Sequence, residues 1–285
     1  MYYLTSTLMV RIENLTCGYG KKIVFRDLNL NFRNGTIYGL LGKNGTGKTT
    51  LLNTIAGLRF PESGRLEVMK YAPSKRQPTF LEDIFFIPEE FQLPPLSIAQ
   101  YQRYYSTFYP KFNSYEFNDY LKLFEISIGD KLQELSYGQR KKVLVSFGLA
   151  ANTSLLLLDE PTNGLDIMGK SQVRKIIAGA FTDQKCIIVS SHQVKDLENL
   201  IDHIVIIDET GVILNQSLAD IGEKLSFKIS FDPGDLEWSI YHEPILRGHA
   251  IVAMNTDGIE NKIDLELLYK ATVSKPKLLN SIFND

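Results

Sequence analysis

A glycine-rich loop between an expected strand and an expected helix is the feature that most constrains the fold of this chain. Residues 42–49 read Gly-Lys-Asn-Gly-Thr-Gly-Lys-Thr, which fits the phosphate-loop pattern G-x-x-x-x-G-K-[S/T]. The apolar stretch Thr36–Leu41 precedes the loop, and a helical sequence follows from about Lys48 to Ala56, where Gly57 ends it. Glycines let backbone N–H groups point at phosphate oxygens, and the helix N-terminus adds partial positive charge. The loop therefore predicts a phosphate-binding site.

Strand-like and helical stretches alternate along most of the chain. Such alternation predicts an α/β fold with a largely parallel sheet, and near-continuous apolar composition indicates strands buried on both faces. Period-3.6 apolar spacing predicts helices from about Leu96 to Ala150. Strands are expected at Val10–Asn14, Thr36–Leu41, Arg65–Met69, Ile84–Ile87, Leu155–Leu158, Ile187–Val189 and Ile204–Ile207.

The sequence changes character after about Asp220. Apolar residues at positions 225, 227, 229 and 231 alternate with Ser226, Lys228 and Ser230, a pattern that predicts a half-buried strand with one solvated face. A second strand is expected at His249–Met254 and a helix at Leu265–Thr272. Because no long flexible linker precedes this tail, we expect it to pack against the main domain.

The composition of the chain argues against several kinds of function and location. The 285 residues carry a net charge of −2, which gives no electrostatic reason to expect nucleic acid or an anionic membrane surface as a partner. No apolar run approaches the roughly 18 residues that a transmembrane helix needs, and the first ten residues lack the basic residues of a secretory signal. Cys17 and Cys186 lie far apart without metal-ligand spacing, and we expect them to be ordinary apolar residues in a reducing compartment. The sequence thus predicts a cytoplasmic protein.

A second chemical motif lies at the end of the apolar run Leu155–Leu158, where Asp159 and Glu160 follow directly. Uncompensated buried carboxylates are costly, so a buried strand that ends in two acids indicates a cation or a solvent cleft. In phosphate-loop enzymes an acid at this place supports Mg²⁺, the role expected for Asp159, and Glu160 can then accept a proton from the attacking water or orient it. By the same template Lys48 reaches the β and γ phosphates and the Thr49 hydroxyl binds Mg²⁺.

Further motifs, in order, resemble those of the ABC ATPases. Residues 135–139, Leu-Ser-Tyr-Gly-Gln, resemble the family's signature sequence and lie about twenty residues before the acidic strand. Residues 161–166, Pro-Thr-Asn-Gly-Leu-Asp, follow that strand, and Ser190-Ser191-His192 comes later. The similarity extends from about residue 9 to about residue 215. The chain is therefore identified as resembling the nucleotide-binding subunit of an ABC transporter.

This resemblance implies a fold and a division of the chain. The fold is a P-loop NTPase α/β fold with a mostly parallel core sheet, N-terminal antiparallel strands and a helical signature subdomain. We predict an ABC ATPase domain at residues 9–221, its helical subdomain at about 93–150, and a small α+β C-terminal extension at 222–285.

The resemblance also implies a head-to-tail dimer in which each ATP lies between one subunit's phosphate loop and the other's signature. Taken alone, Ser136 is more simply a helix N-cap, but within the motif it and the Gly138 backbone are expected to bind the partner's γ-phosphate. Tyr19 matches the aromatic that stacks on adenine, His192 the switch histidine, and Asp166 the loop that couples the two sites.

The predicted catalytic residues are Glu160, His192 and Lys48. The predicted Mg²⁺ ligands are Thr49, Glu89 and Asp159. The predicted nucleotide contacts are Tyr19, Gly42, Asn44, Gly45, Thr46, Gly47, Lys48, Thr49, Thr50, Ser136, Gly138, Gln139 and Asp166.

Two positions depart from the family pattern. Glu89, in Pro88-Glu89-Glu90, stands where the family commonly has a metal-contacting glutamine, and Tyr137 occupies the middle signature position in place of glycine. The carboxylate of Glu89 can approach Mg²⁺ but adds negative charge near the phosphates. Because Ser136 and Gly138 are intact, we expect activity to survive.

An aromatic stripe follows the Pro-Glu-Glu turn. Tyr101, Tyr104, Tyr105, Phe108 and Tyr109 have the spacing of one helix face. One interpretation is packing inside the helical subdomain. The other is that part of the stripe lines a groove for a helix of a membrane subunit, which in this family lies beside the region of Glu89.

The predicted function is that of an ATP-hydrolysing subunit of an ABC transporter, most similar to bacterial ABC-2 and bacitracin-type export systems. Its expected ligands are ATP and Mg²⁺, and its expected partners are a second ATPase subunit, most simply an identical one, and separate transmembrane permease subunits that hold it on the cytoplasmic face of the inner or plasma membrane. A soluble ABC ATPase acting on ribosomes or DNA is the alternative, although fused copies and long coiled coils are missing from the sequence. A non-catalytic nucleotide sensor is a third, against which Glu160 and His192 argue.

Overall fold

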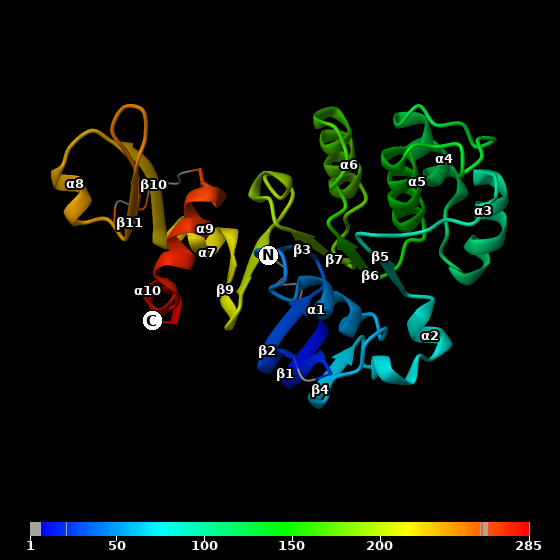
Figure 1. The fold of residues 1–285 in the computed structure, drawn as a ribbon, viewed down its shortest axis with the longest axis horizontal. Helices are drawn as coiled ribbons and strands as arrows, with labels where there is room; N and C mark the ends of the chain where they lie inside the picture. The colour runs from blue at the N-terminus through cyan, green and yellow to red at the C-terminus, as the bar shows by residue number, and fades with distance from the viewer. Residues whose placement is uncertain (1–6, 21, 257, 259–261, 285) are drawn as a thin grey trace, which may run out of the picture.

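A parallel sheet forms the centre of the molecule (Figure 1). The computed structural model describes residues 7–20, 22–256, 258 and 262–284. Within these ranges the central sheet has six strands, all parallel except the last pair. In sheet order they are β5 (Ile84–Ile87), β6 (Leu155–Asp159), β7 (Cys186–Ser191), β3 (Thr36–Leu41), β8 (His203–Asp208) and β9 (Gly211–Ser217). The near-continuous apolar strands β6 and β7 are buried along their whole length, as the sequence predicted.

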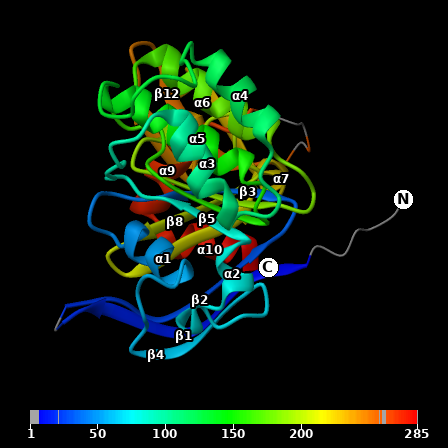
Figure 2. The same ribbon diagram turned by 90° about the vertical axis from the view of Figure 1, so that its right-hand side faces the viewer.

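A second, antiparallel sheet lies on one side of the central sheet. Its order is β2 (Lys22–Arg33), β1 (Leu8–Tyr19), β4 (Ser63–Val68), and helix α1 (Lys48–Ile55) lies between the two sheets (Figures 1 and 2). Buried apolar side chains from this sheet, from α1 and from β3 form one core cluster, in which Cys17 and Cys186 are buried free thiols. The sequence did not predict β2 or β9.

Helices cover the opposite side of the central sheet (Figure 2). The described elements of the helical subdomain are α3 (Ile98–Tyr105), the short 3₁₀ turn η2 (Ser106–Phe108), α4 (Ser114–Leu123) and α5 (Tyr137–Ala150). Phe147 on α5 is fully buried, and its ring lies 4.8–6.1 Å from several other aromatic rings. Helix α6 (Ile167–Gly179) continues the layer, and short turns η1 (Pro73–Lys75), α2 (Pro78–Leu81) and η3 (Val194–Asp196) connect other elements.

The aromatic stripe is divided by the structure. Helix α3 ends at Tyr105 and passes directly into the 3₁₀ turn Ser106–Phe108, whose three residues per turn do not continue the face of α3. Tyr109 precedes Pro110 and adopts an extended conformation, so it lies outside both helical elements. The prediction of one continuous helix face is therefore wrong. Tyr101 is buried against Phe147, as the packing interpretation requires, and Tyr109 also lies near that ring. Other members face solvent: Tyr104, Tyr105 and Phe108 are 52%, 38% and 66% exposed.

The residues after β9 form a small α+β unit that packs on the main domain. Its elements are α7 (Leu218–Lys224), β10 (Leu225–Ser230), α8 (Gly234–Glu237), β11 (Tyr241–Pro244), β12 (His249–Met254), α9 (Leu265–Ser274) and α10 (Pro276–Asn284), and its sheet has the order β10-β12-β11. Leu265 and Leu268 of α9 belong to the same core cluster as Leu197 and Leu200 of the main domain. The two strands and the helix predicted here are confirmed, as is the packing of the tail.

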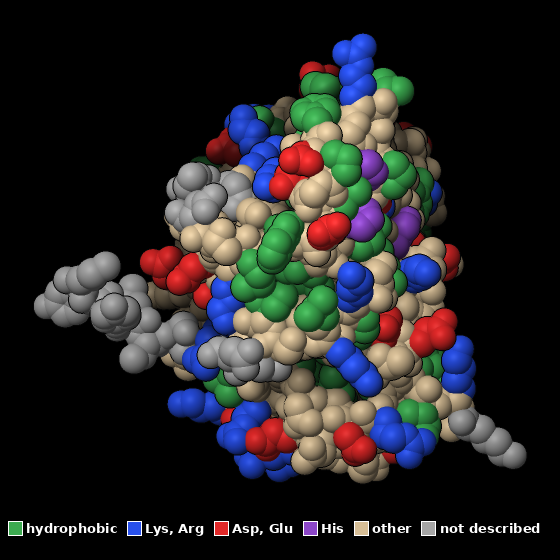
Figure 3. Space-filling view, turned by 90° about the vertical axis from the view of Figure 1, so that its left-hand side faces the viewer, with side chains coloured by type: hydrophobic (Ala, Val, Ile, Leu, Met, Phe, Trp, Pro, Cys, Tyr) green, Lys and Arg blue, Asp and Glu red, His purple; other side chains and the backbone are tan. Residues whose placement is uncertain are grey.

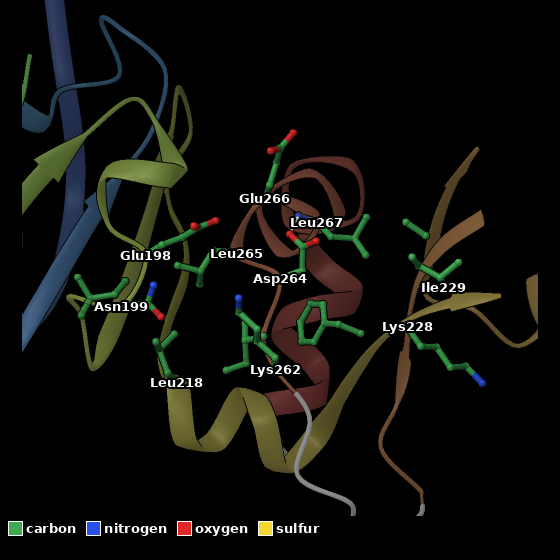
Figure 4. Close-up of a pocket in the computed structure, with 14 residues that line it drawn as sticks. Glu198, Asn199, Leu218, Lys228, Ile229, Lys262, Asp264, Leu265, Glu266 and Leu267 are labelled. Carbon is green, nitrogen blue, oxygen red and sulfur yellow. Dashed lines mark hydrogen bonds between the residues drawn. The ribbon is translucent and has the colours of Figure 1, made fainter. Parts of the chain in front are cut away.

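The expected burial of the β10 face is only partly confirmed. Leu225 is buried, but Ile229 and Phe231 are 58% and 74% exposed. Ile229 borders an open pocket of about 560 Å³ and lies across it from Leu265 (Figure 4), so α9 covers only the first part of the strand. Hydrophobic side chains gather near the middle of the face on this side of the molecule (Figure 3). Ser230, on the face predicted to be solvated, is buried, so the predicted alternation fails at the end of β10.

The described helices were compared with the requirements for a membrane-spanning helix. Each of them falls short of the length and hydrophobicity that a bilayer crossing requires.

Candidate functional site

The glycine-rich loop joins the end of β3 to the start of α1, as predicted. Gly45 and Gly47 have φ angles of 84° and 106°, a region that disfavours other residues. A Cβ atom at Gly47 would lie 2.6 Å from the ring of Phe25, so the close approach of the loop to β2 also requires glycine. The loop N–H groups are thereby presented at the N-terminus of α1, where an anion is favoured.

The backbone of the loop holds the Lys48 side chain. Its ammonium donates hydrogen bonds to the carbonyls of Gly42 at 2.7 Å and Lys43 at 3.1 Å, and lies 3.9 Å from Glu160 Oε1. Burial lowers the pKa of Lys48, and the carboxylates of Glu160 and Asp159 oppose that effect. The structure therefore places a buried cation beside the loop and next to an acid.

A cavity of about 320 Å³ opens beside the loop. It brings together the loop, Tyr19 and the acids after β5 and β6, which lie far apart in the sequence. Its lining residues are Tyr19, Lys22, Val24, Asn44, Gly45, Gly47, Lys48, Thr49, Thr50, Glu89, Asp159 and Glu160. Lys22 and Val24 were not predicted, since the turn into β2 carries no motif.

Asp159 ends β6 with one carboxylate oxygen satisfied and one free. Ser190 on the neighbouring strand β7 donates to its Oδ1 at 2.5 Å, whereas the buried Oδ2 has no hydrogen-bond partner among the described residues. A buried, unpaired carboxylate oxygen is costly unless it meets a cation. Hard oxygen ligands of this kind suit Mg²⁺, and the Thr49 hydroxyl lines the same cavity. The donor set thus fits the predicted magnesium ion.

Glu160 is the most highly connected acid of the site. Its side chain is buried, and its Oε1 lies 2.8 Å from His192 Nδ1 while Oε2 accepts from Ser191 at 3.4 Å. Burial raises the pKa of Glu160, an effect opposed by the His192 hydrogen bond and by Lys48. The residue has a φ angle of 48°, in the left-handed region that few non-glycine residues adopt. The structure therefore joins Glu160, His192 and Lys48, which the sequence had placed in one predicted catalytic set.

Glu89 and Tyr137, the two departures from the family pattern, contact each other. The Tyr137 hydroxyl donates to the Glu89 carbonyl at 2.7 Å, and Glu89 Oε1 accepts from Asn163 Nδ2 at 2.8 Å. The Tyr137 ring stacks on Phe91, with centroids 5.4 Å apart. This contact was not predicted, because 48 residues separate the two positions.

The signature segment stands apart from the cavity. Ser136 caps α5 in a reciprocal arrangement: its Oγ accepts from the Gln139 N–H at 3.2 Å, and Gln139 Oε1 accepts from the Ser136 N–H at 3.0 Å. Asp166 similarly caps α6, accepting from the Gly169 N–H at 2.6 Å. Of the described residues that line the cavity, none belongs to residues 135–139 or is Asp166. The expected helix N-terminus at Ser136 is confirmed, and one chain by itself does not bring it to its own phosphate loop.

Tyr19 lies at the mouth of the cavity with a half-exposed ring. The Arg59 guanidinium stacks on one ring face, 3.5 Å from the centroid, and Thr50 Oγ1 donates to the phenolic oxygen at 3.1 Å. Arg59 was not predicted. Adenine stacking by Tyr19 stays a prediction.

Comparison with known proteins settles the family. Residues 25–163 match the family described as ABC transporter. The lantibiotic transport ATP-binding protein SrtF of Streptococcus pyogenes is 31% identical over 224 residues, which are 73% of this chain and 90% of that protein. This chain belongs to the ABC transporter ATP-binding proteins. Members of this family bind ATP and hydrolyse it.

Other relatives and solved structures agree. The bacitracin transport ATP-binding protein BcrA of Bacillus licheniformis is 28% identical to this chain. The aligned region covers 95% of this chain and 94% of BcrA. A solved ATP-binding subunit of an ABC transporter has a TM-score of 0.68 at 24% identity, over 75% of this chain and 91% of that one. The dimeric cassette MJ0796 bound to ADP and Pi has a TM-score of 0.64 at 24% identity, over 74% and 99%. These likenesses confirm the predicted ABC ATPase fold.

Proposed function

We propose that this chain is the ATP-hydrolysing subunit of an ABC exporter and that it works as a dimer. The hydrolytic part of the proposal rests on the position of the Glu160 carboxylate, which lies near Lys48 and His192 in the cavity that Asp159 also lines. A nucleotide-sensing module would need the loop and its lysine but has no need of this buried acid. The proposed catalytic residues are therefore Glu160, His192 and Lys48.

The proposed mechanism follows from these contacts. The loop N–H groups and Lys48 bind the β and γ phosphates. Thr49, Asp159 and Glu89 would hold Mg²⁺, which would supply positive charge beside the phosphate oxygens. Glu160 accepts a proton from the attacking water or orients it, because burial keeps a basic carboxylate at the cavity wall. His192, hydrogen-bonded to Glu160 through Nδ1, fixes the direction of that carboxylate. Its Nε2, which contacts Gln193 Nε2 at 3.2 Å, could donate to the γ-phosphate only in the imidazolium form, in which both ring nitrogens carry a proton.

A second subunit completes the site in this proposal. Ser136 and the backbone of Gly138 stand at the N-terminus of α5, where unpaired N–H groups favour an anion, yet they do not line the cavity of their own chain. A partner's γ-phosphate placed there would satisfy these groups, with Gln139 and Asp166 beside the same interface. ATP then contacts both subunits only in the closed dimer, so its binding favours closure and its hydrolysis removes that preference.

Export and membrane association are proposed from the relatives. SrtF and BcrA are named lantibiotic and bacitracin transport ATP-binding proteins, and BcrA is similar over almost the whole chain. We place this chain on the cytoplasmic face of the membrane, held there by separate permease subunits. The relatives named for a role are transport proteins, and none of those described here favours a ribosome- or DNA-associated role. We also propose the division into an ATPase domain at 9–221 and an extension at 222–285, a boundary that falls within α7.

The exposed part of the aromatic stripe is the proposed contact with the permease. Tyr104 and Tyr105 face solvent on α3, whereas Tyr101 is buried. Replacing Tyr104 and Tyr105 with Ala should leave ATP affinity unchanged and weaken permease association, measured by co-purification from membranes. Equal loss of ATP binding would instead indicate a packing role, and Tyr101→Ala serves as the packing control because it removes a buried ring.

The deciding experiment uses the Glu160→Gln variant of the full chain. Light scattering after size-exclusion chromatography should show a dimer only with ATP and Mg²⁺, and hydrolysis should fall by about 10² to 10⁴, the usual contribution of a positioned base. Wild-type chain should show turnover in the same buffer. Near-normal turnover of Glu160→Gln would refute the assignment of the base, and a monomer at saturating ATP would refute self-sufficient dimerisation.

A further inference from the structure

A buried lysine lies where the signature helix meets the loop after β6. Lys141, on the second turn of α5, is fully buried, and its ammonium donates to the carbonyls of Glu160 at 2.8 Å and Asn163 at 3.2 Å. The ring of Tyr137, one turn earlier on the same helix, lies 5.4 Å from the ammonium and presents its face to that cation. Helical sequence patterns place lysines at the surface, so this position was not among the predicted site residues.

Burying an ammonium is costly unless its donors are satisfied, and here the partners belong to the site. Burial lowers the pKa of Lys141, and the carboxylates of Glu89, Glu160 and Asp159 oppose that effect. A lysine that only filled space could be replaced by an apolar side chain of similar volume. Its charge is instead directed at two backbone carbonyls that bracket the turn following Glu160.

The hydrogen bonds from Lys141 help to hold an unfavourable backbone conformation at Glu160. Its left-handed φ of 48° is unfavourable for glutamate and persists only where the surroundings fix it. The Glu160 carbonyl accepts from Lys141 and from the Asn163 N–H at 3.1 Å, while the Glu160 N–H donates to Ser190 Oγ at 3.1 Å. These bonds hold both peptide groups that flank the Glu160 side chain. The direction in which its carboxylate points therefore depends on where α5 holds Lys141.

Tyr137 and Glu89 close the set of contacts. The Tyr137 hydroxyl donates to the Glu89 carbonyl, and the Glu89 carboxylate accepts from Asn163, whose carbonyl accepts from Lys141. We call these five residues, Glu89, Tyr137, Lys141, Glu160 and Asn163, the Lys141 cluster. Both positions at which this sequence departs from the family pattern, Tyr137 and Glu89, belong to this cluster. They are joined by the hydrogen bond from the Tyr137 hydroxyl to the Glu89 carbonyl.

We propose that Lys141 and Tyr137 are positioning residues that tie the signature helix to Glu160 of the same subunit, so that the position of α5 sets the orientation of the hydrolytic carboxylate. The inference rests on the proposed function, because it takes Glu160 as the residue that orients water. It adds a route inside one subunit by which the signature end of α5, next to the proposed phosphate site of the partner, is linked to that subunit's own carboxylate.

The test is steady-state hydrolysis by the full-length Lys141→Met variant, in the preparation that gives wild-type turnover. Methionine keeps most of the volume and removes the donors. We expect kcat to fall by about 10- to 100-fold, as for a misplaced catalytic group, with KM for ATP within about threefold of wild type. The matched control is Lys142→Met, which removes the next lysine of α5; its ammonium bonds Gln172 at 3.2 Å, outside the cluster, and kcat should stay near wild type.

A double variant separates positioning from folding. If Lys141 acts through Glu160, adding Lys141→Met to Glu160→Gln should cause no further loss of hydrolysis, because residues that act as a unit are not additive. A purely structural role would lower the activity of both backgrounds equally. Wild-type kcat in Lys141→Met, or a full additional loss in the double variant, would overturn the proposal. Near-normal turnover of Glu160→Gln alone would instead contradict the proposed function.

Tyr137→Phe keeps the experiment decisive if Lys141→Met does not fold. This change removes one hydroxyl and leaves the ring beside Lys141. We expect kcat to fall by about 2- to 10-fold, the usual effect of losing one neutral hydrogen bond, with ATP affinity unchanged. Tyr120→Phe, which removes a hydroxyl from α4 outside the cluster, is its control. Equal kcat in wild type, Tyr137→Phe and Tyr120→Phe would remove Tyr137 from the proposal.

Discussion

The two ends of the predicted ATP site differ in how complete they are within one chain. At the phosphate-loop end, Lys48, Asp159 and Glu160 are buried and converge on one cavity. At the signature end, Ser136 and Gln139 satisfy each other's N–H groups and lie outside that cavity. The fold itself builds the first end, whereas in the proposed dimer the second end would be completed by another chain. The comparison therefore predicts that changes at the two ends separate ATP binding from hydrolysis.

Among the changes that test this comparison of the two ends, the largest effect is expected from Lys48→Ala at the phosphate-loop end. Loss of a positioned cation from a buried phosphate site should reduce hydrolysis by about 10² to 10³. ATP affinity should fall as well, because the ammonium is held at the loop before the nucleotide binds. Binding of a fluorescent ATP analogue to the isolated chain measures the second effect. An unchanged affinity would show that the loop N–H groups bind the nucleotide without Lys48.

Ser136→Ala should lower the rate of hydrolysis without lowering the affinity for ATP. Removal of one hydrogen bond to a charged phosphate should reduce turnover by about 10- to 100-fold. ATP affinity of the isolated monomer should be unchanged, since Ser136 does not line its own cavity. Loss of the N-cap also weakens the first turn of α5. Ser136→Asn, a good N-cap with a different side chain, controls for that effect, and recovery of turnover in this variant would argue against a phosphate contact.

The pH dependence of turnover tests the phosphate-loop end further. Burial raises the pKa of Glu160 above the ordinary range of a glutamate, and a protonated Glu160 cannot accept a proton from water. Turnover should therefore be lost as pH falls through this raised pKa, by about tenfold per pH unit. The profile of kcat against pH measures it. An acid limb at the ordinary pKa of glutamate would contradict the assignment.

Glu89→Gln should have the smallest effect. It restores the residue that the family commonly has and keeps an oxygen that can accept from Asn163. Because the Glu89 carboxylate contributes to the raised pKa of Glu160, its neutralisation should move the acid limb of the pH profile slightly downward. We expect kcat at neutral pH to change by about two- to threefold, consistent with a partly screened charge. A shift of the limb to higher pH would contradict this electrostatic account.

Much of the site was predictable because its motifs are contiguous. The loop at residues 42–49, the acids after β6 and the capping pattern at Ser136 each depend on neighbours within a few positions, so local geometry follows from local sequence. The parallel strands of the central sheet were predicted for a similar reason, since burial on both faces requires continuous apolar composition. Roles that rest on a second chain, such as that of Gly138, stay predictions.

The β10 face shows where such reasoning fails. Alternation at Phe227 and Ile229 predicts a strand correctly, but it cannot tell how far a covering helix extends. That extent depends on α9, which is about forty residues further along the chain. The exposure of Ile229 is therefore decided by tertiary packing.

The sequence by itself determined the fold class, the order of the motifs and the chemistry available at the phosphate loop. Only the tertiary structure decided which polar groups meet: Ser190 with Asp159, His192 with Glu160, and Lys141 with the Glu160 carbonyl. The physical reason is that these contacts depend on strand order and helix placement. Pairing of β6 with β7 sets Asp159 against Ser190, and packing of α5 brings a lysine to a carbonyl 19 residues away.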